Sequence, residues 1–112
     1  MTDSEIDVLV AGGGLAGLTA AMFSARHGRS TLVLTGGAPG GPLLSISRIE
    51  DYPGFADGVP GFDLCPIAQE QAMTAGATFR MEELTALEQD GDGWRASTEG
   101  GEIRARAVIV AT

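Results

Sequence analysis

The sequence predicts an α/β fold, with a central parallel sheet that is followed by an antiparallel β-meander. Two observations carry this prediction. In residues 1–35, two short apolar runs flank a stretch whose apolar residues recur at helical spacing, which is the pattern of a β-α-β unit. Beyond residue 77, short apolar segments alternate with glycine-rich turns, which is typical of antiparallel hairpins. At 112 residues the chain has the size of one domain at most.

The β-α-β unit begins with a predicted strand over residues 6–11, because this run is rich in Val and Ile and too short for a helix. From Leu15 onwards the apolar residues follow a helical period, in a stretch that is rich in alanine. We expect this helix to end at Gly28, because glycine readily adopts the left-handed conformation of a helix C-terminus. Residues 31–35 form the second predicted strand.

Residues 36–62 are dense in Gly and Pro and have no sustained period, so they predict a long loop. A loop of this length inside a compact domain is more often functional than idle. A second helix is expected after it, with Asp63 as its N-cap, Pro66 in its first turn and Gly76 at its end.

The remainder of the chain predicts β-structure. Two glycine-rich turns, residues 90–93 and 99–101, are expected to close hairpins. The continuous apolar run at residues 108–110 predicts a strand at the centre of the sheet, beside the first strand. The predicted strands are residues 78–81, 84–89, 94–98, 103–106 and 107–111.

Charge and composition exclude several classes of function. The seven basic residues are all Arg, against 15 acidic residues, which gives a net charge of −8 and a pI near 4.3. The absence of Lys excludes a P-loop lysine and a Schiff-base lysine. An acidic chain without a basic stripe is not expected to bind nucleic acid or a membrane surface. With one Cys (Cys65) and one His (His27), neither an internal disulfide nor a Cys/His metal cluster is expected.

No targeting or membrane segment is expected. The amino end, residues 1–5, is acidic because it carries Asp3 and Glu5 and no basic side chain, whereas a signal peptide begins with positive charge. The first apolar run, residues 8–11, is far shorter than the roughly 20 residues that span a bilayer. We therefore expect a soluble, cytoplasmic protein, with Cys65 buried and His27 at the C-terminal end of the first helix.

Residues 12–17 have the sequence GGGLAG, which fits G-x-G-x-x-G between a predicted strand and a predicted helix. In this motif Gly12 permits the tight turn, Gly14 lets the backbone approach a diphosphate, and Gly17 lets the helix pack on the strand. The N–H groups at the helix start would face the anion. The alternative is a turn that serves packing alone, but packing does not require the third glycine, Gly13. The motif therefore predicts a Rossmann-like FAD- or NAD(P)-binding domain.

The end of the second strand departs from the usual fingerprint. Thr35 stands where an Asp or Glu normally binds a ribose hydroxyl. A neutral hydrogen bond contributes about 0.5–1.5 kcal/mol, against about 1.5–3 kcal/mol for one to a charged group. No Arg follows Thr35 directly, so a 2′-phosphate is not the expected ligand either. The substitution disfavours a simple NAD site and leaves FAD open.

Three further segments carry a resemblance to a known family: TGGAPGGPL at residues 35–43, IEDYPGF at 49–55 and GFDL at 61–64. They resemble low-molecular-weight thioredoxin reductases, of the FAD-dependent pyridine nucleotide-disulfide oxidoreductases. In that family a T-G or E-G strand end leads into G-G-Q-L, V-E-N-aromatic-P-G and a helix opening near G-P-x-L. The final VIVAT, residues 108–112, resembles a family strand that ends in A-T-G. The resemblance covers essentially the whole chain but only the amino-terminal third of such an enzyme.

The resemblance implies an FAD site. Residues 12–17 would hold the diphosphate, and Thr35 with Gly36 would meet the adenosine ribose. Gly40 and Gly41 would pass beside the ribityl chain and the flavin, where a flat ring needs backbone without side chains. No catalytic residue and no metal ligand are expected. The expected cofactor contacts are Gly12, Gly14, Leu15, Ala16, Gly17, Thr35, Gly36, Gly37, Ala38, Pro39, Gly40, Gly41, Pro42, Leu43, Asp51, Ala111 and Thr112.

Two positions depart from the family pattern. Pro42 stands where the family usually has Gln, which removes an amide side chain and a backbone N–H. Asp51 stands where the family usually has Asn, which replaces an amide with a carboxylate. A carboxylate near the flavin would disfavour its anionic reduced form and lower its reduction potential.

The resemblance also implies an activity for the complete enzyme, an NAD(P)H-dependent oxidoreductase. Hydride would pass from NADPH or NADH to the flavin and then to a disulfide of a thioredoxin-like partner, in a homodimer. Residues 1–112 would be the amino-terminal part of the FAD-binding domain. The NAD(P)H-binding domain and its C-x-x-C pair are absent from them, so no activity is expected of these residues alone. The alternatives are another flavin enzyme, of ferredoxin-NADP reductase or monooxygenase type, and a non-catalytic nucleotide-binding remnant.

Overall fold

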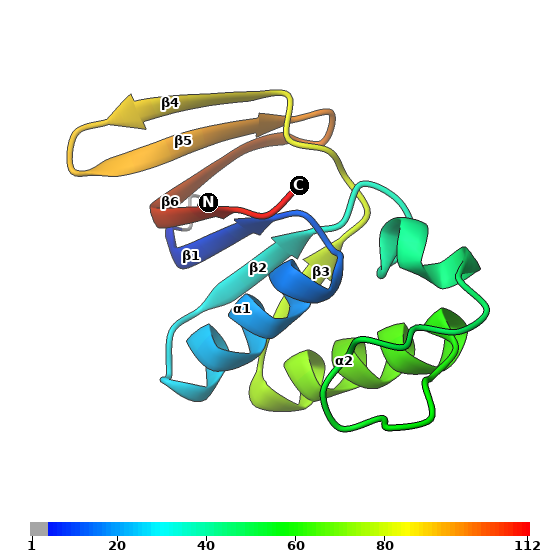
Figure 1. Cartoon of the computed structure of the whole chain (residues 1–112). Coiled ribbons are helices and arrows are strands. Elements are labelled where there is room, and N and C mark those ends of the chain that lie inside the picture. Colours follow the sequence, from blue (N-terminus) through cyan, green and yellow to red (C-terminus); the bar gives the residue numbers. More distant parts are fainter. Residues whose placement is uncertain (1–4) are drawn as a thin grey trace.

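The computed structural model describes residues 5–112 as a six-stranded sheet with two helices packed on one face (Figure 1). Its strand order is β3-β2-β1-β6-β5-β4, with parallel pairing from β3 to β6 and antiparallel pairing from β6 to β4. This confirms the predicted parallel sheet with an antiparallel meander. Residues 1–4, part of the amino end on which the expectation of no signal peptide rests, lie outside the described part. The elements are β1 (Glu5–Ala11), α1 (Leu15–Arg26), β2 (Thr31–Leu34), the 3₁₀-helix η1 (Gly41–Ser45), α2 (Gly61–Ala75), β3 (Thr78–Arg80), β4 (Ala86–Asp90), β5 (Gly93–Thr98) and β6 (Gly101–Val110).

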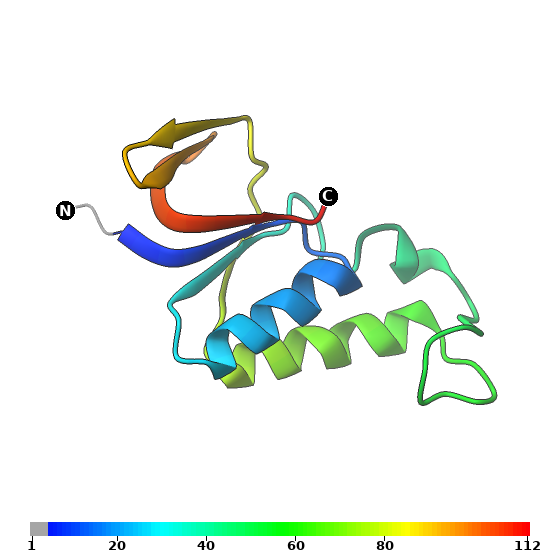
Figure 2. The same ribbon diagram turned by 60° about the vertical axis from the view of Figure 1, so that its left-hand side comes forward.

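The core has two layers, one on each face of the sheet. Successive residues of a strand point to opposite faces, so Val10 packs towards the helices while Leu9 packs towards the meander. Both are completely buried. Figure 2 shows the cause: α1 and α2 lie on one side of the sheet, and β4 and β5 fold over the other. Burial on both faces explains why β1 and β2 are unbroken apolar runs.

Helix α1 packs closely because its buried face is made of small side chains. Ala21 and Ala25 lie in the helix-side core, where they face Ala72 of α2. The helix ends as predicted: His27 is its C-cap, and Gly28 has φ +79° with its N–H donating to the Ala25 carbonyl at 2.9 Å. Among residues 5–112, no helix has both the length and the apolar character needed to cross a membrane.

The predicted start of α2 was wrong. Pro60 is the N-cap and Asp63 lies inside the first turn, so Pro66 is the sixth helical residue and falls in the second turn. The helix begins early because Gly61 is held by η1 and the loop after it. Its N–H donates to the Ile46 carbonyl at 2.9 Å, and a Cβ there would lie only 1.6 Å from the Leu43 carbonyl oxygen.

The two last predicted strands are one strand, β6. No turn separates Arg106 from Ala107, and β6 pairs with β5 along its first half and with β1 from Arg104 onwards. Val108 lies opposite Leu9, which confirms the position beside the first strand. Val110, however, is 62% exposed: it lies on the same face of β6 as Val108, the meander side, but is not part of the core there.

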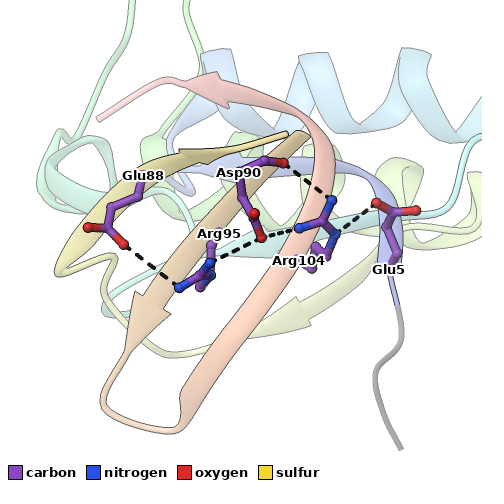
Figure 3. A network of polar contacts seen from close by, with 5 residues as sticks. All are labelled: Glu5, Glu88, Asp90, Arg95 and Arg104. Atoms are coloured by element: carbon purple, nitrogen blue, oxygen red, sulfur yellow. Dashed lines mark hydrogen bonds and ion pairs between the residues drawn. The ribbon is translucent and has the colours of Figure 1, made fainter. Parts of the chain in front are cut away.

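Charged side chains join β1 to the meander (Figure 3). Arg104 of β6 contacts the Asp90 carboxylate, and its Nε donates to Glu5 Oε2 at 3.2 Å. Arg95 lies 3.2 Å from the same Asp90 carboxylate and 4.0 Å from Glu88. The hydrogen bond to Asp90 raises the pKa of Arg95. These side chains are partly exposed, so each ion pair stabilises the fold only weakly, but together they connect four strands.

Candidate cofactor site

The glycine-rich turn lies between β1 and α1, at the carboxyl end of the parallel strands. Gly12 has φ +120°, and a Cβ there would lie 2.3 Å from the Ala111 carbonyl oxygen. A Cβ at Gly17 would lie 1.9 Å from the Gly12 carbonyl oxygen. Since both oxygens belong to backbone, neither position has room for a side chain. The distances give Gly12 and Gly17 the packing roles that the motif assigns to them.

Gly14 differs from its neighbours because it faces open space, with no atom within 4 Å of where its Cβ would be. The first hydrogen bond of α1 runs from the Leu18 N–H to the Gly14 carbonyl at 2.9 Å. Within the described part of the chain, the N–H groups of Leu15, Ala16 and Gly17 find no acceptor, and no acidic residue lies in this first turn. Unpaired N–H groups at the positive end of a helix favour an anion.

Gly13 has a packing role that the sequence analysis did not foresee. A Cβ at Gly13 would lie 2.8 Å from Thr35 Cγ2. The Gly13 carbonyl also accepts a hydrogen bond from the Gly40 N–H at 2.6 Å. The inference that packing does not require the third glycine was therefore wrong. Support for a ligand rests on Gly14 and the unpaired N–H groups instead.

A cavity of about 480 Å³ opens beside this turn. It lies at the carboxyl ends of β1, β2 and β6, where β1 has β2 on one side and β6 on the other. Open α/β sheets bind their ligands at such a switch point. The cavity is lined by Ala11, Gly12, Gly13, Gly14, Leu34, Thr35, Gly36, Gly41, Pro42, Glu82, Glu83, Leu84, Ala111 and Thr112.

The structure brings one group of the expected contacts together around this cavity. This group comprises Gly12, Gly14, Thr35, Gly36, Gly41, Pro42, Ala111 and Thr112. The expected contacts that do not line it are Leu15, Ala16, Gly17, Gly37, Ala38, Pro39, Gly40, Leu43 and Asp51. Of these, Gly40 packs against the side chain of Cys65: a Cβ at Gly40 would lie 2.6 Å from the Cβ of Cys65. Cys65 is buried as expected, and burial raises the pKa of its thiol.

The loop over residues 46–60 has a small core of its own. Ile49 and Val59 exchange backbone hydrogen bonds of 2.7 and 2.9 Å, and both are buried. The rings of Tyr52 and Phe55, 6.3 Å apart, pack against them. These aromatic residues therefore hold the loop together. Asp51 is exposed on the same loop and away from the cavity, and its influence on a flavin stays a prediction.

Six residues that line the cavity were not among the expected contacts. Ala11, Gly13 and Leu34 are sequence neighbours of expected contacts, whereas Glu82, Glu83 and Leu84 lie in a segment that holds none. This segment follows β3, whose parallel pairing with β2 brings its carboxyl end to the same edge of the sheet. The Gly36 N–H donates to the Glu82 carbonyl at 3.0 Å, which fixes this segment beside the end of β2. The strand itself was predicted. What the sequence did not indicate was that this strand pairs with β2, because strand pairing is not encoded in any local pattern.

A second cavity, of about 600 Å³, lies at the opposite end of β1. Three acidic and three Arg side chains line it, so their charges balance, and two opposite pairs are in contact: Arg104 with Glu5 at 3.2 Å and Arg106 with Asp7 at 3.7 Å. Charges that neutralise one another leave little to attract a ligand. The glycine-lined cavity is therefore the candidate site.

Known proteins resemble this chain over the segment that carries the glycine-rich turn and beyond it. The family described as "FAD binding domain" matches residues 7–47, which include most of β1, the glycine-rich turn, α1 and β2. The thioredoxin reductase of Treponema pallidum (strain Nichols) is 36% identical over 110 residues, which are 98% of this chain and 36% of that protein. The thioredoxin reductase of Aquifex aeolicus (strain VF5) is 38% identical over 98% of this chain and 34% of that protein. The chain thus spans about a third of the length of these relatives.

Solved structures agree with the sequence comparison. A thioredoxin reductase from Streptococcus pyogenes MGAS5005 superposes with a TM-score of 0.92 and 32% identity, over 99% of this chain and 36% of that one. The Lactococcus lactis thioredoxin reductase gives a TM-score of 0.90 and 36% identity, over 96% and 35% of the two chains. In sequence and in fold, the chain therefore resembles the amino-terminal FAD-binding portion of the thioredoxin reductases.

Proposed function

We propose that this chain forms the adenosine-diphosphate half of an FAD site, in an NAD(P)H-dependent oxidoreductase of thioredoxin-reductase type. The observation that carries the proposal is the glycine-rich turn: its unpaired N–H groups and the open face of Gly14 lie beside a cavity at the carboxyl edge of the sheet. The resemblance to thioredoxin reductases over nearly the whole chain supports the same cofactor.

The residues present fit the diphosphate and ribose of FAD. The N–H groups of residues 15–17 would bind the diphosphate, and Gly14 leaves the backbone uncovered for it. Thr35 and Gly36 line the part of the cavity where the ribose would bind, while Gly41 and Pro42 belong to the loop expected beside the flavin. Bound FAD would supply the hydride chemistry between NAD(P)H and a disulfide. The residues of this chain bind and orient the cofactor, and none of them is proposed as catalytic.

The complete protein is proposed to act in the cytoplasm as a homodimer. Its electron donor would be NADPH or NADH, and its partner a thioredoxin-like disulfide protein. Residues 1–112 would be the amino-terminal part of the FAD-binding domain, with the NAD(P)H-binding domain and the redox-active Cys pair outside them. These proposals rest on the resemblance. The single Cys of the chain, Cys65, is buried beside Gly40 and has no second Cys with which to form a redox-active pair.

The sharpest test replaces the residue that faces open space. In a Gly14→Asp variant the new carboxylate lies at the N-cap of α1, where Asp is favoured, so we expect the free energy of unfolding to be maintained. The same carboxylate would occupy the N–H groups and repel the diphosphate. Losing one charge-assisted hydrogen bond, worth about 1.5–3 kcal/mol, lowers FAD affinity at least roughly tenfold. Titration followed by flavin fluorescence measures this affinity.

A matched control adds the same charge elsewhere. Gln71 is exposed on α2 and does not line the cavity. The Gln71→Glu variant should therefore bind FAD as the wild-type chain does. Equal FAD affinity of the Gly14→Asp and wild-type chains, with the fold intact by circular dichroism, would refute the proposed diphosphate position.

A further inference from the structure

The end of β2 offers no carboxylate to a ribose. Thr35 directs its hydroxyl at the Arg80 carbonyl, 3.4 Å away, and its N–H donates to the same oxygen at 2.9 Å. Its methyl group faces Gly13. Thr35 is therefore held by the neighbouring strand and by the glycine-rich turn. A dinucleotide site normally has an Asp or Glu that binds the ribose hydroxyls, and here such a carboxylate would have to come from another segment.

Glu83 lies beside this gap. It lines the cavity with Thr35 and Gly36. Gly36 has φ +74° and no side chain, and a Cβ there would lie 3.3 Å from Glu83 Cγ and 3.8 Å from Glu83 Oε2. The bare backbone of Gly36 thus leaves the space that the Glu83 side chain occupies. Within residues 5–112, no Arg and no hydrogen-bond donor contacts the Glu83 carboxylate.

The adjacent carboxylate is already in use, which singles out Glu83. Glu82 Oε1 accepts a hydrogen bond from Thr98 Oγ1 at 2.7 Å, and its carboxylate lies against Gly100. The Glu83 backbone is held in place as well, because its N–H donates to Glu99 Oε1 at 3.3 Å. Two anchors therefore fix the segment after β3, while the Glu83 carboxylate stays available to a ligand.

We propose that Glu83 is the ribose-recognising carboxylate of this site, supplied from the segment after β3 in place of the residue that ends β2. The proposal rests on the proposed FAD site. Two consequences follow. Glu83 accepts a hydrogen bond from a ribose hydroxyl, and its negative charge, with Glu82 and Glu99 close by, disfavours a phosphate on the 2′ position. Glu83 thus selects an unphosphorylated adenosine, as in FAD, over a 2′-phosphorylated one.

Calorimetric titration of the 112-residue chain tests this with three ligands: FAD, ADP-ribose and 2′-phospho-ADP-ribose. The last two differ only in the 2′-phosphate. We expect the wild-type chain to prefer ADP-ribose over its 2′-phosphorylated form by at least roughly tenfold. A Glu83→Gln variant should bind FAD and ADP-ribose roughly tenfold more weakly, because a neutral hydrogen bond replaces a charged one, and should lose most of the preference.

Glu70→Gln is the matched control, since Glu70 is exposed on α2 and does not line the cavity. It should match the wild-type chain with all three ligands. If the wild-type chain binds FAD and Glu83→Gln keeps both the affinity and the preference, the role of Glu83 is overturned while the FAD site stands. If the wild-type chain binds neither FAD nor ADP-ribose, the proposed function fails and this inference fails with it.

Discussion

At the scale of single residues, the glycines of one turn have different duties. A Cβ at Gly12, Gly13 or Gly17 would collide with another part of the chain, whereas a Cβ at Gly14 would enter open space. Gly12, Gly13 and Gly17 therefore serve the packing of the turn, whereas Gly14 leaves open the space on which the proposed diphosphate site depends. A substitution experiment can therefore separate folding from binding within a stretch of six residues.

A Gly17→Ala variant tests the packing role of Gly17 in the turn. Its Cβ would lie 1.9 Å from the Gly12 carbonyl oxygen, and backbone on both sides cannot yield without moving α1 off β1. Alanine favours a helix by about 1 kcal/mol over glycine, but overpacking costs about 1–3 kcal/mol and here involves backbone. We expect a net loss of about 1–2 kcal/mol in the free energy of unfolding, measured by urea denaturation.

The control for this variant is Gly14→Ser. Its new atoms enter open space, and Ser is a favoured N-cap residue. The free energy of unfolding should stay within about 0.5 kcal/mol of the wild-type value. Equal free energies of unfolding for the Gly17→Ala and wild-type chains would show that the turn can move to accommodate a Cβ at this position.

The motif was predictable because its residues are neighbours in the sequence. Gly12, Gly14 and Gly17 could be placed from spacing alone. The contact of Gly13 with Thr35 and that of Glu83 with Gly36 could not, since each depends on which strands become neighbours. Sequence patterns thus identified the glycine-rich side of the candidate cavity and missed its acidic side, which the segment after β3 contributes.

At the scale of whole elements, the strands were predicted correctly where glycine-rich turns separate them. Where no turn residue marks a boundary, the prediction divided one strand into two. Residues 90–93 and 99–101 carry glycine and separate β4, β5 and β6 as expected. Nothing marks a boundary near Arg106, and β6 runs through it to pair with β5 and then with β1. This long strand fixes the meander to the parallel part of the sheet, and the charged side chains around Arg104 reinforce the junction.

An Arg104→Met variant tests that reinforcement. Methionine keeps an apolar stem of similar length but loses the contacts with Glu5 and Asp90. Exposed ion pairs contribute about 0.2–1 kcal/mol each, so we expect the free energy of unfolding to fall by about 1 kcal/mol at low salt. The loss should shrink at 1 M NaCl, because salt screens partly exposed charges.

Arg48→Met provides the comparison, because Arg48 forms an isolated, more exposed pair with Glu50 at 3.3 Å. Its effect should stay below about 0.5 kcal/mol. An equal loss in both variants, or a loss in Arg104→Met that salt leaves unchanged, would assign the effect to the lost side-chain packing.

At the scale of the whole molecule, a net charge of −8 makes most carboxylates repel one another, so acidification relieves repulsion before it breaks contacts. Asp7 is an exception, since it connects β1 to the turn before β2. Its carboxylate accepts a hydrogen bond from the Ser30 N–H at 2.9 Å, and its own N–H donates to Ser30 Oγ at 2.8 Å. The Ser30 N–H holds the pKa of Asp7 below its usual value, with a smaller contribution from Arg106.

This exchange of hydrogen bonds predicts a specific dependence of stability on pH. A lowered pKa in the folded state means that Asp7 stabilises the fold above the unfolded value of 3.8, and that this contribution disappears as the pH falls through the lower folded-state pKa. Urea denaturation at several pH values should therefore show Asp7→Asn to be less stable than the wild-type chain near neutrality, with the gap closing below about pH 4. Asp57→Asn, in the exposed loop, should show no such closing gap. A gap between Asp7→Asn and wild type that persists unchanged to pH 2 would mean that the carboxylate charge plays no part at this corner of the sheet.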